Sequence, residues 1–244
     1  MSGLLPAVPG TAESVAFDPS VVTPLGVLRF DGTVDYWRLP TLPRTVRRLP
    51  GGDLLFRWEH EIAVLELLLR RLEPPSFEGM LPLADCWGAV WRVTALRPLS
   101  RVELSASFHA VPEGVQSGYD GAQALAAVSL WNTETLLTLG GPDEEDICSR
   151  AEYDADLPRR WAALLGEVYE RSPRMKWGVD YLDDDRGLRW ALPPMEQGEH
   201  CVLHAAVSWR NPTPDEAEDD MSTWWAVLLN PGHILGPAST DVAP

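Results

Sequence analysis

The chain has 244 residues, of which 45% are hydrophobic and 23% charged, an ordinary balance for a folded globular protein. This composition excludes disorder as the main state, because there is enough apolar surface to offset the entropy of the chain. No apolar run approaches the ~18 residues of a membrane span. The N-terminus lacks the basic start and continuous apolar stretch of a secretory signal, so we expect a cytoplasmic protein.

The net charge of −16 arises from one part of the chain. Residues 1–101 hold 11 arginines and 11 acidic residues, whereas residues 102–244 hold 9 basic and 25 acidic residues. Such a field repels nucleic-acid phosphates and anionic membranes, and it favours either a basic partner or simply solubility. The change near residue 101 leaves a division into two lobes open, although we expect one domain.

The three cysteines are widely spaced and odd in number: Cys86, Cys148 and Cys201. This spacing predicts neither a disulfide framework nor a paired-cysteine zinc motif. Reduced and mostly buried thiols agree with a cytoplasmic location.

In chain order, residues 1–20 predict a flexible arm, because they are rich in proline and glycine. Residues 27–30 and 33–39 resemble strands, and the Asp31-Gly32 pair between them predicts a two-residue hairpin turn. Asp53 then resembles a helix N-cap. The apolar residues that follow recur at steps of three and four, which predicts an amphipathic helix: Leu55, Trp58, Ile62, Leu65, Leu69 and Leu72.

Residues 87–96 and 101–111 predict strands, and the second alternates apolar with polar side chains. Residues 122–139 fit either a helix or a strand, and residues 140–154 predict an acidic loop. Asp156 is placed to cap a second helix, whose apolar stripe is Leu157, Trp161, Leu164 and Val168.

The remaining chain predicts more antiparallel sheet. Residues 177–182 and 188–192 predict a hairpin, and strands are predicted over 200–210 and 223–229. Together these elements predict an α+β protein, a mostly antiparallel sheet with two main amphipathic helices. The expected organisation is one domain over residues 21–231 and a flexible tail over residues 232–244.

One strand offers a candidate metal site. His200 and His204 are four residues apart, so both imidazoles point to the same face of a strand. A zinc site needs further ligands, for which Glu199, His109 or His233 are conceivable. The alternative is that both histidines are structural, because they lie in a core-like apolar segment.

Known catalytic motifs are absent from the sequence. His60-Glu61-Ile62-Ala63-Val64 lacks the second histidine of the helical zinc-protease motif. There is no serine elbow, dinucleotide fingerprint or phosphate-binding loop. We therefore predict no catalytic residue and no cofactor.

Tryptophan is unusually frequent, with 11 in the chain, and most are expected in the core. Trp224 and Trp225 differ, because adjacent strand residues point to opposite faces and one indole would be presented outward. They lie beside an acidic segment, and a second acidic cluster forms the predicted turn after residue 182. The predicted partner-binding residues are Trp224, Trp225, Asp215, Glu216, Glu218, Asp219, Asp220, Asp183, Asp184 and Asp185.

These features favour a non-enzymatic acidic protein that binds a basic protein partner. Charge would speed the encounter and aromatic side chains would supply the affinity, as in a bacterial immunity protein that neutralises a basic toxin or enzyme. One alternative is a metal-dependent hydrolase that uses His200 and His204. Another is a small-ligand-binding module that uses exposed tryptophans.

Overall fold

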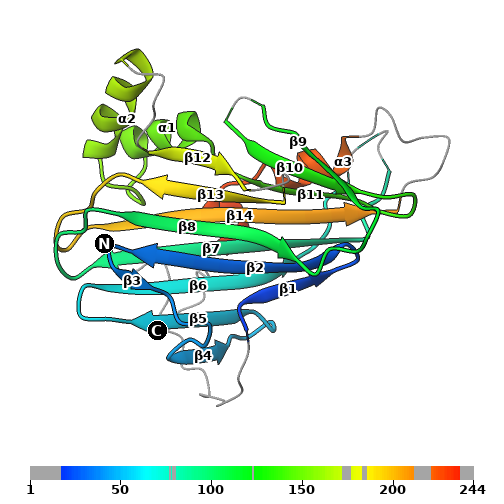
Figure 1. The fold of residues 1–244 in the computed structure, drawn as a ribbon, viewed down its shortest axis with the longest axis horizontal. Coiled ribbons are helices and arrows are strands. Elements are labelled where there is room, and N and C mark those ends of the chain that lie inside the picture. The colour runs from blue at the N-terminus through cyan, green and yellow to red at the C-terminus, as the bar shows by residue number, and fades with distance from the viewer. Residues whose placement is uncertain are drawn as a thin grey trace, which may run out of the picture.

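The computed structural model describes residues 18–76, 78, 81–122, 124–171, 177–182, 186–211 and 221–236. Two antiparallel sheets pack face to face, and short helices lie around them (Figure 1). Strand accounts for 49% of the structure and helix for 14%. The α+β prediction with two main helices is therefore wrong, and the fold is a mostly-β sandwich.

The six-stranded sheet, called the small sheet below, has its strands in this spatial order: β1 (Ser20–Thr23), β2 (Gly26–Val34), β8 (Val102–His109), β13 (Gly187–Leu192) and β12 (Gly178–Tyr181), with β3 (Trp37–Arg38) paired to β2. Strands β8, β12 and β13 confirm the strands predicted there. Alternation along β8 buries Val102, Leu104, Ala106 and Phe108 and turns the polar residues between them outward.

The eight-stranded sheet, called the large sheet, has the order β4 (Thr45–Arg48), β5 (Leu54–Glu59), β6 (Ala63–Leu72), β7 (Asp85–Ala95), β14 (His200–Arg210), β11 (Leu136–Gly141), β10 (Ala126–Trp131) and β9 (Gln116–Tyr119). Strands β7 and β14 confirm two further predictions. The ambiguous segment 122–139 is a hairpin of β10 and β11, paired from Ala126–Gly141 to Trp131–Leu136.

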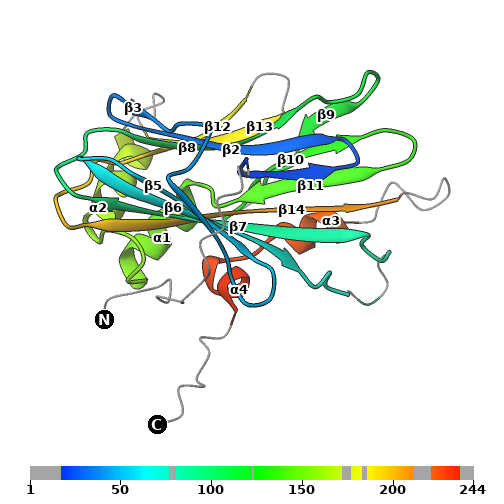
Figure 2. The ribbon, with the colours of Figure 1, turned by 90° about the horizontal axis from the view of Figure 1, so that it is seen from below.

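The helices are α1 (Glu144–Tyr153), α2 (Arg160–Arg171), α3 (Ser222–Val227) and α4 (Pro231–Leu235). Helices α1 and α2 lie at one end of the sandwich, whereas α3 and α4 lie against the face of the large sheet that points away from the small sheet (Figure 2). Helix α2 confirms the second predicted helix. Helix α1 replaces the predicted acidic loop, since Asp143 caps it by accepting a bond from the amide of Asp146.

Residues from the inner faces of both sheets form one hydrophobic cluster. The ring of Trp91 from the large sheet lies 5.3 Å from that of Phe30 and 5.9 Å from that of Trp190, both in the small sheet. Aromatic side chains thus bridge the two layers, as expected for residues that bury large apolar areas.

The helix predicted over Leu55–Leu72 is instead the hairpin of β5 and β6. Leu65, Leu67 and Leu69 face the core, as alternation requires, but Leu68 on the opposite face is also buried, beneath Ile234 of α4. Burial on both faces makes the strand apolar at nearly every position, so its pattern matched a helical stripe. Asp53 caps no helix and forms an ion pair with Arg70 at 2.6 Å.

Two further predictions are corrected by the structure. Asp31 and Gly32 lie inside β2, and the chain turns at Asp35, whose φ is 50°. Oδ1 of Asp35 accepts hydrogen bonds from the backbone amides of Ser100 and Arg101. The strand predicted over residues 223–229 is helix α3. In the described part of the chain, no helix is both long enough and apolar enough to cross a membrane.

Candidate functional site

The two predicted metal ligands lie on the outer face of β14, but only one is accessible. His204 is 1% exposed, with Val90 of β7 beside it in register. Burial lowers the pKa of His204 to about 3, and the positive charge of Arg150 acts in the same direction. Among the described residues, no group of three or more histidine, cysteine or acidic side chains is placed to hold a metal ion. The geometry therefore gives no support to the hydrolase alternative.

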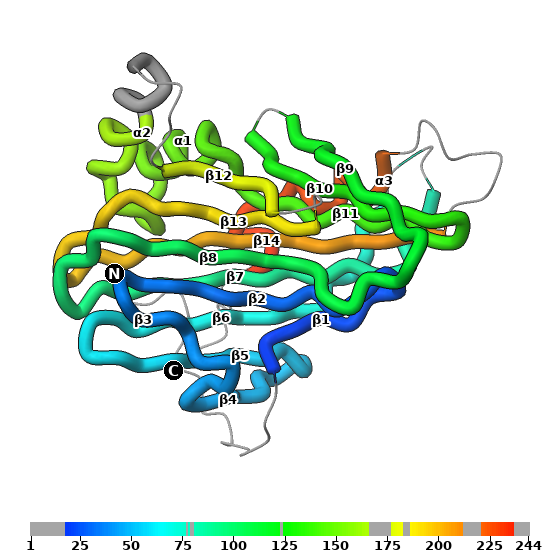
Figure 3. The backbone as a smooth tube through the Cα atoms, in the orientation of Figure 1, coloured from blue at the N-terminus to red at the C-terminus, as the bar shows by residue number. Residues whose placement is uncertain are grey.

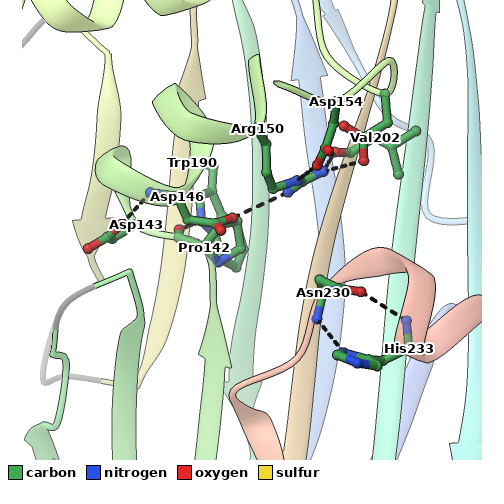
Figure 4. A network of polar contacts seen from close by, with 10 residues as sticks. Pro142, Asp143, Asp146, Arg150, Asp154, Trp190, Val202, Asn230 and His233 are labelled. Carbon is green, nitrogen blue, oxygen red and sulfur yellow. Dashed lines mark hydrogen bonds and ion pairs between the residues drawn. The ribbon is translucent and has the colours of Figure 1, made fainter. Parts of the chain in front are cut away.

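A buried ionic network surrounds Arg150, whose charge acts on His204 (Figure 4). Arg150 of α1, 6% exposed, reaches Asp156 at 2.7 Å and Asp146 at 3.5 Å. Its guanidinium also donates to the carbonyl of Val202 at 2.8 Å. Burial raises the pKa of Asp146, and the charge of Arg150 opposes that rise. The network ties α1 to the part of β14 that extends beyond its pairing with β11, which is a structural task.

The predicted tryptophan pair is divided between the inside and the surface. Trp224 is buried, and its indole donates to the carbonyl of Asp120 at 2.9 Å. Trp225 is 43% exposed, with its ring 5.0 Å from that of Trp224. One indole is thus presented outward, but from a helix rather than from a strand. The acidic candidates lie outside the described residues: Asp183, Asp184, Asp185, Asp215, Glu216, Glu218, Asp219 and Asp220.

A pocket that the sequence did not reveal lies at the edge of the small sheet. Strands β1 and β3 pair with the same side of β2, one near each end (Figure 3). Strand β1 covers β2 from Gly26 to Arg29, and β3 covers Thr33 and Val34. Residues 30–32 of β2 lie between these two pairings, and the gap between β1 and β3 there forms a notch in the sheet edge.

Backbone geometry leaves an acceptor in this notch. The amide of Phe30 donates to the carbonyl of Pro19 at 3.2 Å, whereas the amide of Leu39 donates to the carbonyl of Gly32. Proline has no N–H with which to return the bond, so the carbonyl of Phe30 remains as an acceptor at the strand edge. The side chain of Asp31 accepts the Gly32 amide at 2.7 Å.

The notch opens into a pocket of about 510 Å³, called the edge pocket. Its walls come from four separate parts of the sandwich: Asp18 and Pro19, then Arg29 to Asp31, then Arg38 to Thr41 with Trp58, and finally Ser105, Ser107 and His109. The volume lies in the range of small-molecule sites, and the lining combines apolar surface with convergent polar groups. The edge pocket is therefore the strongest candidate for a functional site in the described residues.

Charges in the edge pocket occur as two opposite pairs. Arg38 lies 3.2 Å from Asp31, and Arg29 lies 3.7 Å from Asp18. All four side chains are more than a third exposed, so each has capacity to bond a ligand. Because each positive group has a negative neighbour, a ligand with net charge of either sign would also meet a like charge.

Ser107 and His109 resemble two parts of a nucleophilic triad. The Ser107 hydroxyl lies 3.2 Å from Nε2 of His109. Within the described chain, no carboxylate bonds His109 to orient its ring, as the third group of a triad would do. The Ser107 hydroxyl and the His109 ring are both polar groups of the edge pocket that can hydrogen-bond a ligand.

The comparisons with known proteins leave the family open. No family model and no curated protein matches the chain. Among solved structures, a protein assigned as a kojibiose phosphorylase from the human microbiome is similar over 80% of this chain, with 8% identity and a TM-score of 0.43. A polysaccharide lyase is similar over 79%, with 12% identity and a TM-score of 0.35. The chain spans 23% and 26% of those two proteins.

Proposed function

We propose that the protein is a binding module for a small, neutral, hydroxyl-rich ligand such as a saccharide, held in the edge pocket. The observation behind this proposal is the pocket's balanced lining. Asp18, Asp31 and the carbonyl of Phe30 accept hydrogen bonds, whereas Arg29 and Arg38 donate them.

Hydroxyl groups match such a lining, because each one both donates and accepts. Bonds to ionised side chains are about twice as strong as those between neutral groups, so a few of them give useful affinity. Pro19, Leu39 and Trp58 also line the pocket, but each is buried, so they shape its apolar wall and present little surface to a sugar ring. This proposal develops the ligand-binding alternative with a different set of residues.

The proposal is tested by binding to an array of neutral saccharides, followed by calorimetric titration of the best ligand. We expect Asp31→Asn and Arg38→Ala each to weaken binding about tenfold, because each removes one charged hydrogen bond. Arg71→Ala is the matched control, since Arg71 forms an exposed ion pair with Asp85 in the large sheet. Equal affinity in all three variants would place the ligand elsewhere.

A basic protein partner is a second candidate, and the charge asymmetry favours it. Residues 102–244 carry the whole net charge of −16, and Trp225 is exposed next to one acidic segment of the sequence. An electrostatically steered association slows about tenfold or more when salt rises. Salt-insensitive association with a captured partner would count against this candidate. For either candidate function we keep the prediction of a cytoplasmic protein, which the three free cysteines support because thiols stay reduced in that compartment.

A further inference from the structure

The outer face of the small sheet continues beyond the edge pocket. Strand register aligns Asp31 of β2 with Ser105 of β8, and Ser105 with Arg189 of β13. Arg189 is in turn opposite Asp180 of β12, and the two side chains form an ion pair at 2.6 Å. One straight row of polar side chains thus crosses four strands, from the pocket to the far edge of the sheet.

The middle of this face carries only short side chains. In the neighbouring row, Arg29 is opposite Ser107, and Ser107 is opposite Gly187. A Cβ on Gly187 would lie 2.5 Å from the carbonyl oxygen of Ala106 and 2.9 Å from the Cβ of Ser107, so glycine is required there. Ser105, Ser107 and Gly187 therefore leave the middle of this face shallow, and longer charged side chains lie at both ends.

We propose that this face is one elongated binding site, with a second subsite at the Arg189–Asp180 pair. The ligand is then a short oligosaccharide that lies across the strands, with one unit in the edge pocket. Neighbouring strands are ~4.8 Å apart, so the row from β2 to β12 spans about 14 Å, longer than a single sugar ring. This inference rests on the proposed function, and it adds the length and direction of the ligand.

The chemistry at the far end matches that of the pocket. Arg189 and Asp180 are 43% and 60% exposed, so both are accessible to a ligand beside their mutual bond. They offer a donor and an acceptor with no net charge, as do Asp31 and Arg38 at the near end. The Ser105 and Ser107 hydroxyls between them suit bridging bonds to a neutral chain.

The experiment uses an array that carries neutral sugars as monosaccharides and as linear oligosaccharides of the same sugar. The full-length protein is compared with Arg189→Ala and Arg38→Ala, and Arg71→Ala is again the control. We expect oligosaccharides to bind at least about tenfold more tightly than the monosaccharide, the effect of one additional charged hydrogen bond. Arg189→Ala should reduce oligosaccharide binding to the monosaccharide level and leave monosaccharide binding unchanged, whereas Arg38→Ala should weaken both.

The outcomes separate the two proposals. Equal binding of short and long sugars, or oligosaccharide binding that Arg189→Ala leaves intact, overturns the second subsite while the pocket stands. Absence of binding to every sugar, or binding that Arg38→Ala does not weaken, overturns the proposed function together with the second subsite. Because the Arg189–Asp180 pair is largely exposed, its loss should leave folding intact, which thermal unfolding checks.

Discussion

The outer faces of the two sheets differ in what covers them. On the large sheet, α3 and α4 bury the outer side of β14, so residues 201–210 are buried at every position. On the small sheet, the outer side of β8 presents Glu103, Ser105 and Ser107, all partly exposed. The covered face therefore contributes to stability, whereas the open face retains polar groups available to a ligand. Mutations on the covered face should accordingly change the free energy of unfolding, whereas mutations on the open face should change ligand binding.

The largest expected effect is at Arg150 of α1, whose guanidinium bonds the carbonyl of Val202 in the buried strand β14. Replacing it in Arg150→Met leaves the buried carboxylate of Asp156 without its ionic partner. Breaking a buried pair in this way costs about 3–5 kcal/mol of unfolding free energy. Urea denaturation measures this loss, and a change below about 1 kcal/mol would show that the network is not structural.

Acid should also destabilise the covered face through His204. Its folded pKa of about 3 lies below the usual histidine value of 6.5, so only the unfolded state takes up a proton between these values. Stability is therefore unaffected by this group about one pH unit or more above 6.5, and it falls as the pH decreases from there toward 3. At pH 5 the loss from this residue is about 2 kcal/mol.

The variant His204→Leu should remove that part of the pH dependence, measured by denaturation at pH 7 and pH 5. His200→Leu, on the same strand but partly exposed, serves as the control. The same pH slope in wild type and His204→Leu would contradict the assignment.

The smallest expected effect on folding is on the open face. Arg189→Ala removes one side of an exposed ion pair and should change the unfolding free energy by about 0.5 kcal/mol or less. Arg150 and Arg189 are both arginines paired with aspartates, so the comparison contrasts a buried pair with an exposed one. Similar losses in the two variants would remove the distinction between the faces.

The contrast between the faces also explains which parts of the fold were predictable. Apolar and polar residues alternate along β8 because one of its faces is in contact with solvent, and this alternation predicted a strand. Strand β6 is covered on both faces near Leu68, so its alternation is masked and resembled a helix. The segment at Trp224 and Trp225 has a buried and an exposed indole in either conformation, and burial pattern over so short a segment does not separate helix from strand.

The edge pocket could not be found from the sequence. Its residues come from β2, β3, β5 and β8 and from the loop segments 18–19 and 39–41, and the sheet topology brings these segments together. The Asp31-Gly32 pair predicts a turn, but Gly32 lies inside β2, where a Cβ would lie 2.8 Å from Cδ1 of Leu39. Pro19 lies in the segment predicted as a flexible arm, although its missing amide leaves an acceptor in the pocket.

The most direct measurement of the central claim is the ¹H–¹⁵N NMR spectrum of the tryptophan indoles during titration with the best neutral saccharide from the array. Trp58 lines the edge pocket, and its indole donates to the carbonyl of Pro40 at 3.0 Å, so its signal reports on that site. Its resonance is assigned with Trp58→Phe. We predict that the Trp58 signal shifts with saturation, whereas the signals of Trp224 and Trp225 on the covered face do not. Shifts confined to Trp224 and Trp225, or no shift with any saccharide, would contradict binding in the edge pocket.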